Sequence, residues 1–343
     1  MKKWIAAILT LTLMLSMLPA AFAVNEDIEG SLMIYTSMYE FEVEKMKDAL
    51  KVEFPNLDVE FFPSGTGTIQ TKVAGEMETG RLSCDMLMVA EPAYSLELKE
   101  LGYLEPMELK NPEELFRDGL DYDKDGYWYP VRTLNMVLAY NPEKFSPDDL
   151  PKTFRDFAED PAMKKYISMS NPLTSGTAMA SVTALSDKYG YAYFEALGKN
   201  QVMVESGSSA LAKLQSGECK EIMILEESVL KIRAEENSPI SVIYPEDGVI
   251  LIPSTIMTIA ENRSANQNIE ACQAVTEWML SEAGQEYILE GYMHSVLKGM
   301  RPPQGSIETD QLAEMNMGVD WDRCYHSRDE IRTRFQEAVT IAK

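Results

Sequence analysis

The chain has 343 residues, of which 55 are Asp or Glu and 31 are Lys or Arg, so its formal net charge at pH 7 is −24. A chain this acidic is repelled by nucleic acid and by anionic membrane surfaces, and we expect neither as a partner. Its length exceeds what one compact hydrophobic core usually holds, so we expect two lobes.

The first residues predict an export signal. Lys2 and Lys3 precede an apolar run at residues 5–18, and small residues follow as far as Ala23. We interpret residues 1–23 as a signal peptide, because the apolar run is shorter than the ~20 residues that span a bilayer. No Cys stands directly after the predicted cut, so we expect a periplasmic or extracellular protein without a lipid anchor.

From residue 31 the pattern alternates between strands and helices. Apolar runs predict strands at residues 31–35, 57–62 and 84–90, and helical periodicity predicts helices at residues 43–54, 66–79 and 91–101. This alternation is typical of a parallel sheet, in which ligands bind at the carboxyl ends of the strands.

An acidic stretch follows at residues 107–126 and contains the sequence DYDKDG. Asp121, Asp123 and Asp125 match the start of a calcium loop, but the twelfth position is Arg132, where a bidentate Glu is required. We therefore interpret this stretch as an acidic turn and predict no metal site there.

Two long extended runs bracket a second alternation of strands and helices. Residues 127–140 predict a first crossing between lobes, and residues 248–260 predict a return crossing. Between them we expect a helix from Thr153, strands at 167–170, 201–205, 221–227 and 239–245, and helices at 175–188, 208–215 and 229–236. Helices at 269–280 and 283–289 should pack on the first lobe. The expected domains are thus residues 31–133 with 255–305 (lobe 1), residues 134–254 (lobe 2), and a helical tail at 306–343 packed on lobe 2.

Three predicted strand-to-helix turns are rich in hydroxyl groups. They read YTSMY at residues 35–39, SGTGT at residues 64–68 and LTSGTA at residues 173–178. Ser and Thr are ordinary helix caps, but hydroxyl groups and unpaired N–H groups at a helix start can also cradle an anion. Because three turns repeat the pattern, we expect them to share one ligand.

The order of these turns, together with DMLMVAE at residues 85–91, GYWYP and YPEDG, resembles the extracellular solute-binding proteins of ABC importers. Within them it resembles the group that includes ferric-binding and hexose-phosphate-binding proteins. The resemblance implies an α/β, type II periplasmic-binding-protein fold, with two doubly wound sheets joined by two extended hinge crossings. It also implies a monomer that holds one small ligand between the lobes and meets a membrane permease transiently.

The ferric-binding members carry two adjacent tyrosines after the strand that corresponds here to residues 221–225, where this chain has Glu226, Glu227 and Ser228. Neither of its two histidines lies near the early YTSMYE turn, where those members often supply another ligand. We therefore expect a phosphorylated sugar or an organophosphonate as ligand. Ferric iron, held by Tyr39 and carboxylates, is the alternative.

An enzyme is not expected, since the chain has no GxSxG, GxxxxGK or HExxH motif. An exported hydrolase with two carboxylates is a second alternative. We predict no cofactor and no metal. The four cysteines form no CxxC pair, and we expect Cys84 and Cys272 to be buried thiols.

Two charged residues receive specific roles among the expected ligand contacts. Arg132 should donate two hydrogen bonds to the anion, unless it pairs with the neighbouring acidic turn. Glu227 should accept hydrogen bonds from sugar hydroxyl groups or an ammonium group, unless it is a solvated Glu in a first helical turn. The full set of expected contacts is Thr36, Ser37, Tyr39, Ser64, Gly65, Thr66, Gly67, Glu91, Arg132, Thr174, Ser175, Gly176, Thr177 and Glu227.

Overall fold

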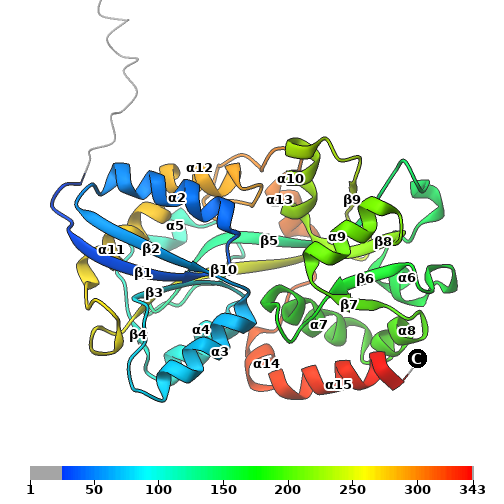
Figure 1. The fold of residues 1–343 in the computed structure, drawn as a ribbon, viewed down its shortest axis with the longest axis horizontal. Coiled ribbons are helices and arrows are strands. Elements are labelled where there is room, and N and C mark those ends of the chain that lie inside the picture. The colour runs from blue at the N-terminus through cyan, green and yellow to red at the C-terminus, as the bar shows by residue number, and fades with distance from the viewer. Residues whose placement is uncertain (1–24, 342–343) are drawn as a thin grey trace, which may run out of the picture.

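A computed structural model describes residues 25–341, so the predicted signal peptide lies outside the described residues. Two α/β halves lie side by side, and two long strands run between them (Figure 1). We call the half with the earliest strands lobe 1 and the other half lobe 2; the residue boundaries given above stay a prediction. Within residues 25–341, no helix has the length and apolar character needed to cross a bilayer.

Lobe 1 is built from the first predicted alternation. Its strands are β1 (Gly30–Thr36), β2 (Leu57–Pro63) and β3 (Met86–Ala90), and its helices are α2 (Glu40–Glu53), α3 (Thr66–Met77) and α4 (Ala93–Glu100). The three strands are parallel, with β1 between the other two. Every residue of β3 is buried, as its continuous apolar run predicts.

Lobe 2 repeats the arrangement. Its strands are β6 (Ile167–Ser170), β7 (Met203–Glu205), β8 (Glu221–Leu225) and β9 (Ser241–Ile243), and its helices are α6 (Phe154–Glu159), α7 (Gly176–Tyr189), α8 (Ala192–Lys199), α9 (Gly207–Ser216) and α10 (Glu226–Glu236). The sequence pattern did not predict α8, and it predicted the start of α10 three residues too late. Glu226 and Glu227 form the first turn of α10, where the helix dipole favours acidic side chains.

The two predicted crossings are strands of the sheet. β5 (Tyr129–Tyr140) and β10 (Ile250–Ile259) pair with each other in antiparallel orientation, β10 pairs with β3, and β5 pairs with β8. The sheet order is therefore β2-β1-β3-β10-β5-β8-β6-β7, one continuous path instead of two separate sheets. The backbone of both crossings is buried along its whole length, so its N–H and C=O groups must find partners.

The short strand β4 (Leu104–Glu105) and the short helix α5 (Pro112–Leu115) come before β5. Within residues 25–341, five more α-helices follow the return crossing. They are α11 (Ile269–Met279), α12 (Glu282–Glu290), α13 (Thr309–Met315), α14 (Trp321–His326) and α15 (Arg328–Ile341). α15 packs on α8, where the rings of Phe335 and Phe194 lie 5.2 Å apart. α14 contacts α4 of lobe 1 as well as α7 of lobe 2, so the tail touches both lobes (Figure 1).

The acidic stretch forms a turn beside α4. Lys99 Nζ lies 2.6 Å from a carboxylate oxygen of Asp123 and 3.1 Å from one of Asp125. An ammonium group thus neutralises two of the three acids that matched a calcium loop. Cys84 and Cys272 are buried free thiols, as predicted, and Cys219 and Cys324 are buried and free as well.

Candidate ligand-binding cleft

A cleft of about 470 Å³ opens between the lobes, at the carboxyl ends of the strands. The turn after β1 and the first turns of α3, α7, α9 and α10 line it. Four helix starts therefore surround one space, where the positive ends of the helix dipoles favour an anionic occupant. Ten of the fourteen predicted contacts line the cleft: Ser37, Tyr39, Gly65, Thr66, Arg132, Thr174, Ser175, Gly176, Thr177 and Glu227.

Three of the other predicted contacts shape the turns from behind. The buried Thr36 hydroxyl group accepts a hydrogen bond of 3.1 Å from the Met38 amide, and the Ser64 amide donates to the Thr36 carbonyl at 2.9 Å. The Gly67 amide donates to the Thr174 carbonyl of lobe 2 at 3.2 Å. Gly67 is therefore a point where the two lobes touch.

The fourth residue outside the lining is Glu91. Its backbone has a φ of 78°, and its carboxylate is buried beneath Gly176 of α7. Gln70 Nε2 donates to one carboxylate oxygen at 3.2 Å, and Arg328 Nη2 lies 3.7 Å from it. Burial raises the pKa of Glu91 to about 7, although Arg328 opposes the shift. Glu91 lies in a strand-to-helix turn, as predicted, but its side chain points into the protein interior and not into the cleft.

Glu91 should make the protein less stable at alkaline pH. Its folded-state pKa of about 7 exceeds the ordinary value of 4.5, so its contribution to stability is present in acid and lost as the pH rises through 7. We expect Glu91→Gln to gain about 1.4 kcal/mol relative to the wild type between pH 6 and pH 9, because one pH unit of the shift lies above pH 6. Urea unfolding at both pH values measures this difference. An equal pH dependence in both proteins would contradict it.

Arg132 lies on β5 at the floor of the cleft, with 2% of its side chain exposed. One terminal nitrogen donates to Met293 Sδ at 2.7 Å, and the other lies 3.5 Å from Ser37 Oγ. Its Nε is buried without a partner among the described residues. Since the acidic turn pairs with Lys99 instead, pairing with that turn is not the role of Arg132. The guanidinium retains donors that a ligand could use.

Two buried carboxylates flank this guanidinium. Glu42 Oε2 lies 3.9 Å from Arg132 Nη1, and Glu227 lines the cleft from the first turn of α10. Burial raises the pKa of Glu42 to about 7 and that of Glu227 to about 8, with Arg132 opposing both shifts. Glu227 is buried, so it is not the solvated Glu of the alternative interpretation. Glu42 was not predicted as a site residue, because its position in α2 matches an ordinary first-turn acid.

Tyr39 and its neighbours close one side of the cleft. The Tyr39 hydroxyl group shares a hydrogen bond of 3.1 Å with Ser228 Oγ of lobe 2, and its ring stacks on Phe41 at 5.7 Å. Lys231 Nζ lies 3.7 Å from the centre of the Phe41 ring. Although 44% of Tyr39 is exposed, desolvation and the Glu227 carboxylate raise its pKa to about 12, so the phenol is protonated at neutral pH. Phe41, Ser228 and Lys231 were missed; the i, i+4 spacing of Glu227 and Lys231 was an available signal.

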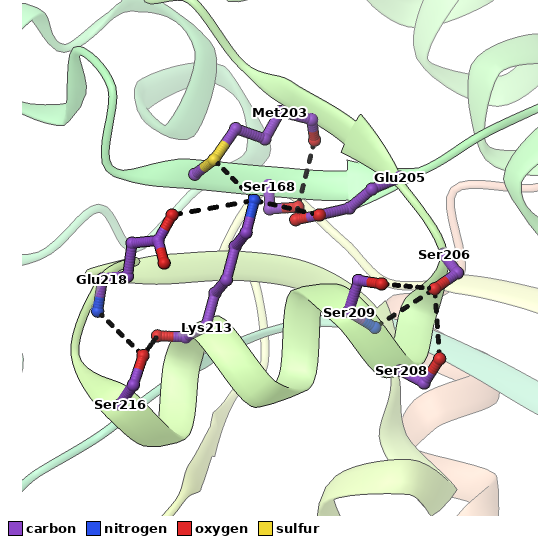
Figure 2. A network of polar contacts seen from close by, with 9 residues as sticks. All are labelled: Ser168, Met203, Glu205, Ser206, Ser208, Ser209, Lys213, Ser216 and Glu218. Atoms are coloured by element: carbon purple, nitrogen blue, oxygen red, sulfur yellow. Dashed lines mark hydrogen bonds and ion pairs between the residues drawn. The ribbon is translucent and has the colours of Figure 1, made fainter.

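The first turn of α9 is a fourth hydroxyl-rich helix start. The helix was predicted, but its first residues were not predicted as ligand contacts. Ser206 Oγ accepts from the Ser209 amide at 3.2 Å and lies 3.1 Å from Ser208 Oγ (Figure 2). Behind this start, Lys213 Nζ pairs with Glu205 at 3.0 Å, and Ser168 donates to Glu205 at 2.7 Å (Figure 2). The Lys213 ammonium group therefore neutralises the negative charge of Glu205. The sequence ESGSSA repeats the pattern of the other turns, so this start could have been found.

Comparisons with known proteins agree with this architecture. Residues 83–317 match the family described as bacterial extracellular solute-binding protein. Iron-bound HitA from Pseudomonas aeruginosa is 19% identical, with a TM-score of 0.77 over 90% of this chain and 99% of that one. AfuA from Actinobacillus pleuropneumoniae, solved with fructose-6-phosphate, is 18% identical, with a TM-score of 0.77 over 92% and 100%. A ferric binding protein from Campylobacter jejuni is 17% identical, with a TM-score of 0.71 over 90% and 99%. These similarities confirm the type II periplasmic-binding-protein fold.

Proposed function

The chain belongs to the bacterial extracellular solute-binding proteins, which capture small ligands for a membrane permease, and we propose that its own ligand is a phosphorylated sugar or an organophosphonate. The observation that carries this proposal is the Arg132 guanidinium, which lies in the cleft with unused donors. Hydroxyl-rich helix starts from both lobes surround the same space. An anion held there would also hold the lobes together.

The energies are sufficient for useful affinity. A partly buried helix start favours an anion by up to ~2 kcal/mol, and each hydrogen bond to a charged group adds roughly 1.5–3 kcal/mol. Micromolar binding requires about −8 kcal/mol, which several such contacts supply after the costs of association. The cleft volume of about 470 Å³ falls within the usual range for an organic ligand of modest size.

The part of the cleft beside Arg132 also suits an organic group. Glu227 can accept hydrogen bonds from hydroxyl or ammonium groups, and the exposed face of Tyr39 offers an aromatic surface to a sugar ring. The ligand class we infer therefore combines a phosphate or phosphonate near Arg132 with a hydrogen-bond donor near Glu227. We also infer that this chain binds its ligand without transforming it.

Iron is the alternative that the relatives raise, since the names of two of them state iron or ferric ion. In this chain the pair after β8 is Glu226 and Glu227, and Tyr39 is the single tyrosine in the cleft lining. Within residues 25–341, no three His, Cys, Asp or Glu side chains form a group that could hold a metal ion. These observations favour the organic anion over iron.

A thermal-shift screen tests the proposal. Hexose phosphates, aminoalkylphosphonates, dicarboxylates and ferric salts would each be added to the protein, and hits would be measured by calorimetry. A ligand at 100 times its dissociation constant stabilises the folded state by about 2.7 kcal/mol. We expect shifts with phosphorylated or phosphonated compounds. A shift with ferric salts alone, abolished by Tyr39→Phe, would establish iron instead.

Binding should weaken as the pH rises from 7 to 9. Glu42 and Glu227 have pKa values of about 7 and about 8, so both are ionised at pH 9 and add negative charge beside the anion. A phosphate monoester has its second pKa near 6 and changes little over this range. We expect about tenfold weaker binding of fructose 6-phosphate at pH 9, measured by calorimetry in buffers of different ionisation enthalpy. Glu227→Gln should flatten the profile, and a flat wild-type profile would refute the idea.

A further inference from the structure

A buried carboxylate next to the cleft forms a network that ligand binding does not explain. Glu226, the first residue of α10, has 1% of its side chain exposed. Its Oε2 accepts a hydrogen bond from Asn135 Nδ2 at 2.9 Å and lies 3.0 Å from His294 Nε2. Its Oε1 accepts from Ser306 Oγ at 2.6 Å and from the Tyr244 hydroxyl group. Four side chains thus converge on one carboxylate.

These four partners come from different parts of the chain. Asn135 lies on the crossing strand β5, Tyr244 follows β9, and His294 and Ser306 lie between α12 and α13. Backbone bonds of 2.9 and 3.2 Å also pair His294 with Thr133 of β5. The Glu226 carboxylate therefore joins the start of α10 to the crossing strand and to the segment that leaves lobe 1.

His294 is held from both sides of its ring. Its Nδ1 lies 2.9 Å from Thr309 Oγ1, and its Nε2 faces Glu226. Among the described residues, His294 is the one basic side chain that lies within 4 Å of the Glu226 carboxylate. Burial alone would raise the pKa of Glu226, but the contacts with His294, Ser306 and Tyr244 lower it. The network thus favours an ionised carboxylate.

The N-cap residue of α10 is Leu225, which offers no capping hydrogen bond to the helix start. The turn nevertheless carries Glu227 and Ser228, which line the cleft, and Ser228 meets Tyr39 of lobe 1. Glu226 points away from the cleft into the network while Glu227 points towards it.

We propose that Glu226 and His294 form a positioning pair, which fixes the first turn of α10 against β5 and so sets Glu227 and Ser228 for the ligand without touching it. The effect on affinity rests on the proposed function. The effect on the helix start does not, so the two are tested separately.

The first test measures hydrogen–deuterium exchange without ligand. In Glu226→Gln, amides at residues 226–229 and 133–136 should exchange at least about tenfold faster than in the wild type. Glu236→Gln, an exposed acid at the other end of α10, is the matched control and should change neither segment. Tyr244→Phe and Ser306→Ala each remove one hydrogen bond to Glu226. If Glu226→Gln does not fold, these two variants provide the same test. Unchanged exchange in these variants would overturn the proposal.

The second test uses the fact that the chain has two histidines, His294 and His326. The imidazole NMR signal of His294 should move in Glu226→Gln, whereas the signal of His326, which is exposed, should stay. An unmoved His294 signal would show that the two residues are not coupled in solution.

The third test is a double-mutant cycle with fructose 6-phosphate and inorganic phosphate as probes. Glu226→Gln should weaken fructose 6-phosphate about tenfold and leave inorganic phosphate unchanged, because the pair acts through Glu227. Adding Glu226→Gln to Glu227→Gln should then cost little more. Additive losses would overturn the positioning role. If the wild type binds neither probe, the proposed function is wrong. The exchange and NMR results would still show whether Glu226 and His294 fix the start of α10.

Discussion

Arg132→Gln should bind fructose 6-phosphate at least about a hundredfold more weakly than the wild type. The substitution removes two charge-assisted hydrogen bonds, each of which contributes roughly 1.5–3 kcal/mol. It also leaves Glu42 and Glu227 buried beside the anion without the positive charge that faces them. Isothermal titration calorimetry measures this loss directly.

Arg132→Lys separates charge from geometry. A lysine keeps the positive charge but lacks the planar fork, so we expect an intermediate loss of about tenfold or more. Arg301→Lys is the matched control, because Arg301 is exposed and pairs with Glu286 on the surface. Equal affinities for wild type, Arg132→Lys and Arg132→Gln would mean that the anion binds elsewhere.

Gly67→Ala should hinder closure of the cleft. A Cβ atom at this position would lie 2.7 Å from the Leu173 carbonyl oxygen and 2.9 Å from Thr174 Cα, both in the backbone of lobe 2. Backbone cannot yield as a flexible side chain does, and overpacking of this kind costs typically 1–3 kcal/mol. Because the clash exists only while the lobes touch, we expect ligand affinity to fall by about ten- to a hundredfold.

The control for this prediction lies on the same helix. A Cβ atom on Gly75 meets nothing within 4 Å, so Gly75→Ala should leave affinity unchanged and stabilise α3 by up to about 1 kcal/mol. Small-angle scattering with saturating ligand measures closure. A ligand-bound Gly67→Ala profile identical to that of the wild type would show that the lobes do not need this contact.

Much of the fold could be predicted because its signals are local. The buried strand β3 is a continuous apolar run, and the alternation of strands and helices indicates parallel sheets without reference to distant residues. The short helix α8 was missed because its stability comes from packing on α15, far along the chain. The pairing of β5 with β10 likewise depends on two segments that no local pattern connects.

Some features of the candidate site could likewise be predicted from neighbouring residues, and others could not. The turns at Ser37, Gly65 and Ser175 have a local signature, and the structure brings all three to one cleft. The direction in which a side chain points depends on contacts with distant parts of the chain. Glu91 stands in a correctly predicted turn but points under α7, because its φ of 78° rotates it away from the cleft. Whether an acid such as Glu42 is buried depends on which segment covers it, here the turn at Gly291.

The position of β10 between β3 and β5 constrains the order in which the protein can fold. The strand that completes lobe 1 is made only after the strands of lobe 2, so those strands can pair before lobe 1 is complete, whereas α15 reaches α8 last of all. Until β10 arrives, the apolar strand β3 has one edge without a partner, and such an edge invites pairing with other chains. Contacts this distant in sequence also close slowly. The nascent protein should therefore depend most on protection from aggregation during the interval before residues 250–259 emerge.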